Sequence, residues 1–254
     1  MEEKENQNKK LFGLVGQNIS YSFSKGYFAE KFEKEGLSDH EYVNFDIQSI
    51  DEFPKIIHEH RFQLKGLNVT IPYKQEVFEY LDKVHKVARK IGAVNTIRFT
   101  KRGNLKGYNT DAAGFQNSLE PLLKAHHKKA LILGTGGASK AIAYVLKNLG
   151  IQYFKVSRNP VKKKEISYDD LNETLMKEHT VIINCTPLGT FPNVTQKPNI
   201  PYQFLTENHL LYDLIYNPEK TAFLKEGEAK GAQIKNGLEM LIGQAEESWR
   251  IWNK

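Results

Sequence analysis

The chain has 254 residues, of which 40% are hydrophobic and 26% are charged. This composition is typical of a globular protein with a full core, and it excludes a chain that is disordered throughout. The net charge is +6, but the basic residues follow no nucleic-acid-binding motif. A solvated surface is the default interpretation of this charge, an anionic small molecule is the alternative, and no nucleic-acid partner is expected.

Compartment and metal use follow from a few residues. A single cysteine, Cys185, excludes an intrachain disulfide and favours the reducing cytoplasm. No run approaches the roughly 20 apolar residues that cross a bilayer, so no membrane association is expected. Residues 1–10 lack the apolar region of a secretory signal and are predicted to form a disordered tail. His58, Glu59 and His60 do not have metal-ligand spacing, and no metal site is predicted.

From residue 11 onward, short apolar runs alternate with amphipathic stretches, which predicts an α/β fold with largely parallel strands. Helices are predicted after Ser24 and after Ser49, where Glu52 completes a capping-box spacing. A hairpin is predicted around the turn at 102–104. The strands predicted in this first half cover residues 11–16, 42–47, 66–71, 93–99 and 105–108.

A second series of β-α units follows residue 111. A helix is predicted over 111–127, and a last amphipathic helix over Leu238–Trp252. The strands predicted between them cover residues 129–133, 152–157, 181–184 and 210–214. The sequence therefore predicts two domains, with a boundary near residues 111–128.

A glycine-rich turn lies between the strand ending at Leu133 and a helix predicted over 140–149. Its sequence is Gly134, Thr135, Gly136, Gly137, Ala138, Ser139. Glycines let the backbone approach a pyrophosphate, and a helix N-terminus offers N–H groups and a positive dipole end. Because Ser139 replaces the third glycine of G-x-G-x-x-G, a purely structural tight turn is the alternative.

The end of the next predicted strand indicates which dinucleotide binds. An NAD site usually has Asp or Glu there, to hold the ribose 2′-hydroxyl. This chain has Ser157 and Arg158, with Lys162 one turn further on. A guanidinium pairs well with a 2′-phosphate, so NADP is predicted, with ordinary surface charges as the alternative.

Two ionisable residues stand at the ends of strands. Lys74 follows N-V-T-I-P-Y, and Asp111 follows G-Y-N-T. Reduction of a ketone by hydride needs a proton for the developing alkoxide and a donor that polarises the carbonyl. A lysine and an aspartate that meet at one hydroxyl supply both.

Taken in order, these segments resemble the shikimate dehydrogenase family, from about residue 11 to residue 252. The matching motifs are I-S-Y-S-F-S at 19–24, N-V-T-I-P-Y-K at 68–74, G-A-V-N-T at 92–96, G-Y-N-T-D at 107–111, G-T-G-G-A-S at 134–139 and N-G-L-E-M-L-I-G-Q at 236–244. The resemblance implies an N-terminal α/β substrate domain, residues 11–110 completed by the C-terminal helix 238–254. This domain would face a Rossmann-type NADP-binding domain, residues 111–237, across a cleft. It also implies NADP-dependent reversible reduction of 3-dehydroshikimate to shikimate, in aromatic amino-acid and chorismate biosynthesis.

Roles for individual residues follow from the same resemblance. Lys74 and Asp111 match the catalytic pair, and Ser22 and Ser24 match the serines that hold the substrate carboxylate. The implied substrate-binding residues are Ser22, Ser24, Thr70, Lys74, Asn95, Asp111, Tyr216 and Gln244. The implied cofactor-binding residues are Gly134, Thr135, Gly136, Gly137, Ala138, Ser157, Arg158, Lys162, Asn184, Thr186, Leu214 and Gly237.

Departures from the family pattern leave alternatives open. Asn18, Tyr21 and Lys25 replace the usual Pro, His and Pro around the two serines, so the geometry of this loop, rather than its chemistry, is left open. One alternative is a quinate/shikimate dehydrogenase of broader specificity that uses NAD. Another is a non-catalytic dinucleotide-sensing homologue, although such a protein has no need of Lys74 and Asp111. A monomer or a homodimer is expected.

Overall fold

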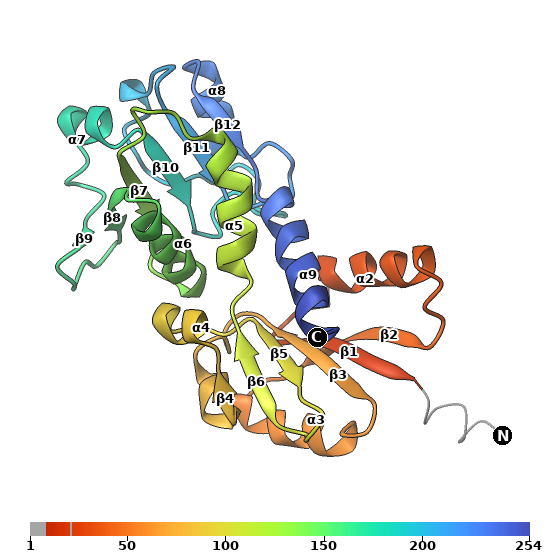
Figure 1. Cartoon of the computed structure of the whole chain (residues 1–254). Coiled ribbons are helices and arrows are strands. Elements are labelled where there is room, and N and C mark those ends of the chain that lie inside the picture. The colour runs from red at the N-terminus through yellow and green to blue at the C-terminus, as the bar shows by residue number, and fades with distance from the viewer. Residues whose placement is uncertain (1–8, 21) are drawn as a thin grey trace. The chain divides into compact units, whose positions relative to one another are not determined.

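The structure is a computed structural model that describes residues 9–20 and 22–254. The chain divides into two compact units (Figure 1). The N-terminal unit runs to Thr110 and includes Ala245–Lys254, and the C-terminal unit is Asp111–Gln244. Most of the predicted tail, residues 1–8, lies outside the described residues. Lys10 is already part of the first strand, so the tail prediction is wrong at that residue.

The N-terminal unit is built on a mixed six-stranded sheet of order β2-β1-β3-β5-β6-β4. Its strands are β1 (Lys10–Gly16), β2 (His40–Asp46), β3 (Leu64–Val69), β4 (Lys83–Val84), β5 (Thr96–Phe99) and β6 (Leu105–Tyr108). Strand β1 pairs in parallel with β2 and β3, whereas β5 is antiparallel to β3 and β6. The predicted β5–β6 hairpin is confirmed, while the two-residue strand β4 was not predicted.

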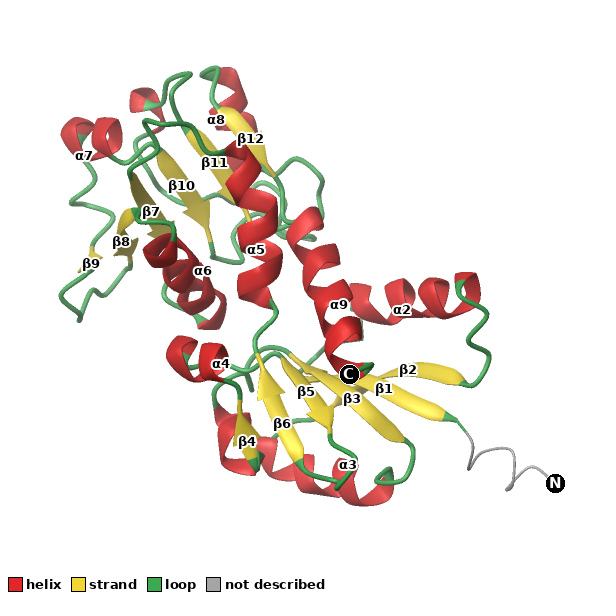
Figure 2. Ribbon diagram, in the orientation of Figure 1, coloured by secondary structure: helices red, strands yellow, loops and turns green. Residues whose placement is uncertain are grey.

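Both faces of this sheet are covered (Figure 2). Leu11 and Val15 of β1 belong to one core cluster, and the alternate residues Phe12 and Leu14 belong to another, as the two-residue period of a strand requires. The helices of this unit are α2 (Phe23–Lys34), η1 (Ile50–Glu52), α3 (Phe53–Glu59), η2 (Glu76–Tyr80) and α4 (Lys86–Ile91).

Helix starts in the N-terminal unit are set by side-chain caps. The capping box of Ser49 and Glu52 is confirmed at the start of η1. Helix α2 buries Phe28 and Phe32 on one face, as their spacing predicts. Its N-cap is Ser22, however, and not Ser24, because the Ser22 hydroxyl accepts the N–H of Ser24 at 3.2 Å. The helix therefore begins closer to β1 than expected.

Helix α9 (Leu238–Trp252) has the predicted bounds. The family resemblance implies that residues 238–254 lie together in the first domain, whereas contacts divide the helix between Gln244 and Ala245. Its last turn docks on the sheet of the N-terminal unit, where the Trp252 indole N–H donates to the Ile97 carbonyl at 3.0 Å. A Cβ on Gly66 would lie 2.2 Å from the same indole, so the strand needs glycine there.

The C-terminal unit has a six-stranded sheet of order β12-β11-β10-β7-β8-β9, with every described pairing parallel. Its strands are β7 (Lys129–Leu133), β8 (Gln152–Val156), β9 (Glu165–Ile166), β10 (Val181–Asn184), β11 (Leu210–Asp213) and β12 (Gln233–Lys235). Counted from β7, this order is that of the Rossmann fold, which confirms the predicted class. Strands β9 and β12 were not predicted individually.

The helices of this unit are α5 (Asp111–Leu119), η3 (Glu120–Leu122), α6 (Gly137–Asn148), α7 (Glu173–Glu178), η4 (Tyr202–Phe204) and α8 (Ala222–Ala229). Helix α6 packs on β7 and β8, and α8 packs on β11 and β12. Helix α5 ends well before the predicted residue 127, because Pro121 disfavours helical backbone at the preceding residue. In the part of the chain that the structure describes, no helix is long and apolar enough to cross a membrane.

Candidate active site

A buried network of polar side chains joins the strand ends of the N-terminal unit to helix α9. It consists of Asn68, Asn95, Thr96, Thr110 and Ser248, which we call the polar network. The Ser248 hydroxyl lies 2.8 Å from that of Thr96 and 3.2 Å from that of Thr110, and it accepts from the Asn68 amide at 3.0 Å. Since the hydroxyls of Thr96, Thr110 and Ser248 are wholly buried, each bond replaces water that these groups have lost.

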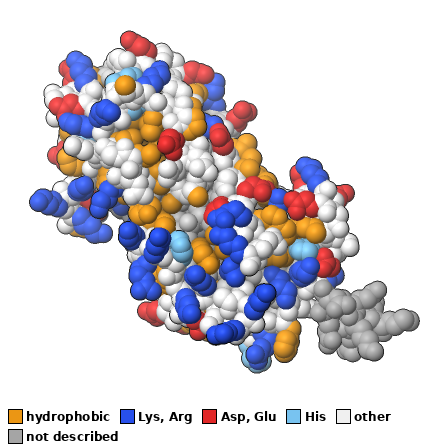
Figure 3. Space-filling view, in the orientation of Figure 1, with side chains coloured by type: hydrophobic (Ala, Val, Ile, Leu, Met, Phe, Trp, Pro, Cys, Tyr) orange, Lys and Arg blue, Asp and Glu red, His pale blue; other side chains and the backbone are white. Residues whose placement is uncertain are grey.

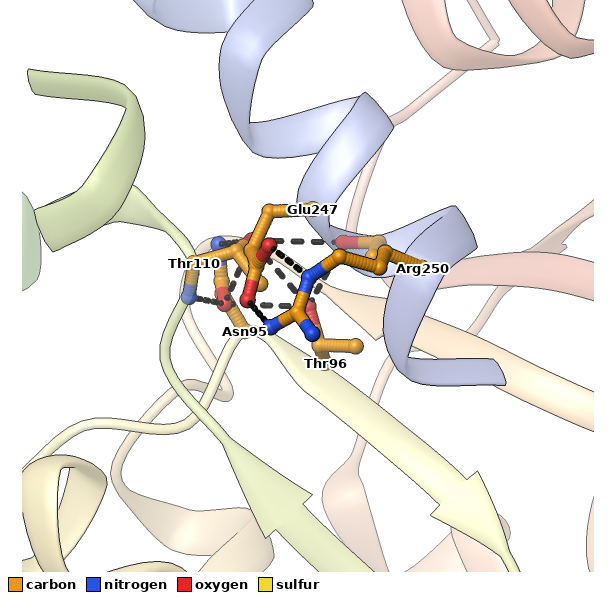
Figure 4. Close-up of polar contacts among 6 residues, drawn as sticks. Asn95, Thr96, Thr110, Glu247 and Arg250 are labelled. Carbon is orange, nitrogen blue, oxygen red and sulfur yellow. Dashed lines mark hydrogen bonds and ion pairs between the residues drawn. The ribbon is translucent and has the colours of Figure 1, made fainter. Parts of the chain in front are cut away.

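The predicted substrate ligand Asn95 is held in one orientation by this network (Figure 4). Its side-chain oxygen accepts the backbone N–H of Thr110 at 2.7 Å and the hydroxyl of Thr96 at 3.1 Å. Its amide nitrogen donates to the Thr110 hydroxyl at 3.0 Å. A buried amide with several partners cannot rotate without breaking them, so Asn95 is preorganised.

Lys74 lies in a turn between β3 and η2 that is fixed at both ends. The N–H of Thr70 donates to the Val15 carbonyl at 2.9 Å, and the Lys74 carbonyl accepts the N–H of Val94 at 2.8 Å. The buried Tyr73 anchors the middle of the turn through a 2.8 Å bond to the Ile47 carbonyl. The backbone of Lys74 is thus tied to the residue that precedes Asn95, which groups the predicted residues Thr70, Lys74 and Asn95 in one region.

The loop that carries Ser22 and leads into α2 is linked to the same region by hydrogen bonds. The Tyr42 hydroxyl donates to the Asn68 oxygen at 2.9 Å. Burial raises the pKa of Tyr42, and a hydrogen bond with Ser24 offsets this only in part, so the hydroxyl stays protonated at neutral pH. Ser24 therefore reaches the polar network through Tyr42. Tyr21, one of the departures from the family pattern, lies outside the described residues.

Asn18 gives this loop a distinct backbone. Its φ is 55°, in the left-handed region, and the Asp46 carboxylate accepts the N–H groups of Asn18 and Ile19 at 2.8 and 3.1 Å. Asparagine tolerates that region better than most residues. Proline, which is usual in the family at this position, cannot adopt it and has no N–H. The backbone at Asn18 therefore has a conformation that proline at this position could not adopt.

The variant Asn18→Pro is expected to lower the free energy of unfolding by about 1–3 kcal/mol, because it forces φ away from 55° and removes a hydrogen bond. Urea unfolding measures this. Asn18→Gly is the control: glycine accepts the same φ and keeps the N–H, so it should stay within about 0.5 kcal/mol of the wild type. Equal stability of the two variants would contradict this account.

In the C-terminal unit, Asp111 and Gln244 are placed by a close crossing of two helices. Asp111 is the first residue of α5 and is buried, where the helix dipole favours a carboxylate. A Cβ on Gly114 would lie 2.5 Å from the Met240 carbonyl and 2.9 Å from the Gln244 nitrogen of α9. Because only glycine permits this approach, Gln244 lies beside the turn of α5 that Asp111 begins.

The glycine-rich turn has the geometry of a phosphate-binding site. Gly134 has a φ of 104°, which favours glycine, and a Cβ on it would lie 3.2 Å from the Thr186 methyl group. Gly136 is the N-cap of α6 and provides no side-chain cap, so the first N–H groups of the helix are not occupied by its own cap residue. N–H groups at the start of a helix bind anions well, so this arrangement favours a phosphate-binding role over a purely structural tight turn.

Ser139, which replaces the third glycine of G-x-G-x-x-G, is buried in the C-terminal unit. Its hydroxyl donates to the Gly136 carbonyl at 2.7 Å and accepts from the Lys155 ammonium at 3.2 Å. Burial lowers the pKa of Lys155, and the nearby charges of Lys162 and Lys140 lower it further. Burial and Lys162 likewise lower the pKa of Lys140.

We call Lys140, Lys155 and Lys162, together with Arg158 two residues after the end of β8, the basic cluster. Lys and Arg side chains gather on the C-terminal unit near β8 and β9 in Figure 3. The positive charge of Lys162 lowers the pKa of both Lys140 and Lys155, which indicates repulsion that a bound dianion would relieve. The sequence identifies Arg158 and Lys162 but not the other two. A lysine among the apolar residues of β8 is the signal that could have identified Lys155.

Asp213 connects the loops that carry the other predicted cofactor residues. Its carboxylate accepts from the Asn184 amide at 3.0 Å, the Ile215 N–H at 3.0 Å and the Thr221 hydroxyl at 2.6 Å. The Asn184 oxygen in turn accepts the Thr186 hydroxyl at 2.7 Å. The side chains of Asp213 and Asn184 thus position the residues around them. Sequence reasoning did not identify Asp213, and it assigned Asn184 to cofactor binding only.

The loop that follows Asp213 carries two further predicted residues, Leu214 and Tyr216. Gly237 is packed against Leu214, since a Cβ on it would lie 2.0 Å from the Leu214 carbonyl oxygen. The Gly237 N–H donates to the Ile215 carbonyl at 3.0 Å. Tyr216 comes next in the same loop and is half-buried. The loop that holds Leu214 and Tyr216 is therefore fixed by backbone bonds on one side and by Asp213 on the other.

Burial raises the pKa of Asp213 to about 6, although its hydrogen bonds oppose this. The folded state therefore holds the proton more tightly than the unfolded state, whose pKa lies near 3.8. The contribution of Asp213 to stability is greatest below that value and declines as the pH rises through about 6. A pKa difference of this size corresponds to on the order of 3 kcal/mol.

Asp213→Asn is expected to lack this decline. We expect the unfolding free energy of the wild type to fall relative to that of the variant between about pH 4 and about pH 7, and the difference to be constant above. Asparagine can still accept from the Asn184 amide and the Ile215 N–H, and can donate to the Thr221 hydroxyl, so the variant should fold. Urea unfolding across this range tests the expectation, and parallel pH profiles would refute it.

Cys185 and the histidines add no chemistry to the site. Burial raises the pKa of the Cys185 thiol, so it stays protonated at neutral pH and is a poor nucleophile. Within residues 9–20 and 22–254, no group of three or more His, Cys, Asp or Glu side chains could hold a metal ion.

Known proteins resemble this chain over nearly its whole length. The family model of the shikimate dehydrogenase substrate binding domain matches residues 14–97. The NADP(+) shikimate dehydrogenase of Carboxydothermus hydrogenoformans is 37% identical over 263 residues, which cover 97% of this chain and 92% of that protein.

Solved structures agree with the sequence matches. Shikimate 5-dehydrogenase from Thermus thermophilus, in complex with NADP(H) and shikimate, is 30% identical, with a TM-score of 0.83 over 96% of this chain and 93% of that one. The enzyme from Listeria monocytogenes, in complex with shikimate and NAD, is 28% identical, with a TM-score of 0.85 over 96% of this chain and 92% of that one. This chain therefore belongs to the shikimate dehydrogenase family.

Proposed function

We propose that this chain catalyses the NADP-dependent, reversible reduction of 3-dehydroshikimate to shikimate. The observation that carries the proposal is the match over 97% of the chain to an NADP(+) shikimate dehydrogenase. Lys74 and Asp111 both lie in the motifs by which the sequence resembles that family. A non-catalytic dinucleotide sensor would not need this proton-transfer pair. The N-terminal unit would bind the substrate and the C-terminal unit would bind NADP.

The substrate is a ring carboxylate with several hydroxyl groups, which suits the polar residues of the candidate site. Ser22, Ser24 and Tyr216 would hold the carboxylate through neutral hydroxyl donors. Thr70, Asn95 and Gln244 would bind the ring hydroxyls. The polar network keeps Asn95 in a fixed orientation, so little side-chain entropy would be lost on binding.

Lys74 and Asp111 would carry the proton chemistry. When bound, NADPH supplies a hydride to the carbonyl carbon. In the direction of reduction, Lys74 would donate a proton to the ketone oxygen as negative charge develops there, and Asp111 would hydrogen-bond the same group. In the direction of oxidation, Lys74 would take the proton from the hydroxyl.

The basic cluster favours NADP over NAD. Arg158 and Lys162 stand where an NAD enzyme usually has a carboxylate, and Lys140 and Lys155 add charge nearby. The residues proposed to bind the cofactor are Gly134, Thr135, Gly136, Gly137, Ala138, Ser157, Arg158, Lys162, Asn184, Thr186, Leu214 and Gly237. The Listeria relative was solved with NAD, so cofactor choice needs a direct test.

An absorbance assay at about 340 nm, crossing shikimate and quinate with NADP⁺ and NAD⁺, tests this proposal. We expect the highest kcat/KM by far for shikimate with NADP⁺. Equal or better turnover of quinate with NAD⁺ would instead support a quinate/shikimate dehydrogenase of broader specificity. No turnover in any combination, with NADP⁺ binding retained, would support the sensor.

We infer further that the protein works in the cytoplasm as a monomer or a homodimer. The single cysteine and the absence of a membrane-crossing helix among the described residues support the first point. Sedimentation velocity at two protein concentrations distinguishes the two oligomeric states.

A further inference from the structure

A cavity of about 610 Å³ lies within the N-terminal unit, away from the residues of the candidate active site. One part of its lining comes from α3 and the turn that follows it, and another from the end of the β5–β6 hairpin. Its volume lies within the roughly 300–1,000 Å³ of small-molecule sites. None of the residues proposed above for substrate or cofactor lines it.

The walls of this cavity are mainly apolar and aromatic. The side chains that form them are Phe53, Ile57, Phe62, Tyr80, Phe99 and Leu105. Phe53 and Tyr80 pack edge to face with their ring centroids 5.7 Å apart. The side chain of Phe62 is 82% exposed, which is unusual for so large an apolar group. An aromatic ligand would bury that ring and gain further edge or face contacts with it.

Every charged or potentially charged group in the lining, apart from the Tyr80 phenol, is basic. These groups are His58, Arg61 and Arg102, and no Asp or Glu is among the lining residues, all of which the structure describes. Neither arginine is in an ion pair within residues 9–20 and 22–254. The Arg61 guanidinium lies 5.3 Å from the centre of the Phe62 ring, so charge and aromatic surface adjoin.

Local sequence explains this arrangement. Pro54, Ile57 and His58 recur at three- and four-residue spacing and share one face of α3, and Arg61 follows in the next turn. Arg102 lies in the β5–β6 turn beside Gly103, whose φ is 78°. At the lower edge of Figure 3, near α3, basic side chains, a histidine and a hydrophobic side chain are exposed together.

We propose that this cavity is a second ligand site, which binds an aromatic carboxylate. The ring would enter among the aromatic side chains, and the carboxylate would pair with Arg61 and Arg102. A guanidinium binds a carboxylate through two parallel hydrogen bonds, and the lining contains no carboxylate that would compete. A neutral ring would leave the arginines without a partner, and a small inorganic anion would leave the apolar walls uncovered. The site does not depend on the proposed function.

The probe for this site is anilinonaphthalene sulfonate, an aromatic anion that fluoresces when it is bound. It is titrated into the full-length protein with NADP⁺ and shikimate at saturation, so that the candidate active site is occupied. We expect one saturable site, from which phenylbutanoate displaces the probe and neutral phenylbutanamide does so at least about tenfold more weakly.

Charge-removing variants locate the site. Arg61→Gln/Arg102→Gln should weaken probe binding about tenfold or more, and Phe62→Ser should weaken it several-fold. The matched control is Arg89→Gln, an exposed arginine on α4 that does not line the cavity, which should change affinity less than about twofold. All four substitutions are at exposed residues, and thermal unfolding checks that each variant folds.

Three results would overturn the proposal. The first is wild-type affinity in the double arginine variant. The second is loss of probe binding when NADP⁺ and shikimate are added, which would place the probe in the active site. The third is binding that appears only as a dimer dissociates, which would make the cavity an interface between two copies. Shikimate turnover does not enter these measurements, so they stand or fall separately from the proposed activity.

Discussion

Lys74→Ala is expected to lower kcat for shikimate oxidation about 10³-fold, because general acid–base catalysis by a positioned side chain contributes roughly 10²–10⁴-fold. The KM for shikimate should change much less, since Ser22, Ser24 and Asn95 would still hold the substrate. Steady-state kinetics with NADP⁺ measure both constants. The NADP⁺ dissociation constant should be unchanged, which separates loss of chemistry from loss of fold.

Two further variants identify what Lys74 contributes. Lys74→Arg keeps the positive charge but cannot release a proton near neutral pH, so it should remain almost as inactive as Lys74→Ala if proton transfer is the role. Lys90→Ala, an exposed lysine on α4, is the matched control and should keep normal turnover. A kcat for Lys74→Ala within about tenfold of the wild type would rule out the proposed role.

Arg158→Ala is expected to raise the KM for NADP⁺ by about 10- to 100-fold and to leave that for NAD⁺ within about twofold. The reason is the loss of a charge-assisted pair with the 2′-phosphate, which contributes roughly 1.5–3 kcal/mol, whereas NAD⁺ has no phosphate there. Both constants come from the absorbance assay with shikimate at saturation.

The electrostatic origin of this effect has its own control. Lys163→Ala removes an exposed charge from the same loop but lies outside the basic cluster, so the NADP⁺ constant should hardly change. Added salt should weaken NADP⁺ binding to the wild type more than to Arg158→Ala. The reason is that salt screens the attraction between Arg158 and the 2′-phosphate, which the variant lacks. Equal changes in the NADP⁺ and NAD⁺ constants of Arg158→Ala would contradict the assignment.

The polar network shows why part of the site was not predicted. Asn68 and Ser248 are 180 positions apart in the sequence, and their hydrogen bond exists only because α9 returns to the first sheet. Ser248 has no motif around it, and a serine within an amphipathic helix is ordinarily a surface residue. Its role follows from burial, which only packing reveals.

Charge placement gives the same lesson in the C-terminal unit. Arg158 was predicted because its distance from the glycine-rich turn has a known meaning. Lys155 and Ser139 meet because β8 and α6 are adjacent in the fold, and Asp213 joins the β11–α8 loop to the end of β10. The cavity beside Arg61 and Arg102 likewise needs α3 and the hairpin turn to come together.

The sequence by itself determined the α/β class, the capping box at Ser49, the β5–β6 hairpin and the glycine-rich turn at Gly134. Each of these depends on neighbours a few residues apart, through hydrophobic period, capping or backbone freedom, so local chemistry suffices. The tertiary structure alone decided the polar network and the position of Lys140 and Lys155 beside Lys162. These depend on which distant groups lose water together, and therefore on how the elements pack.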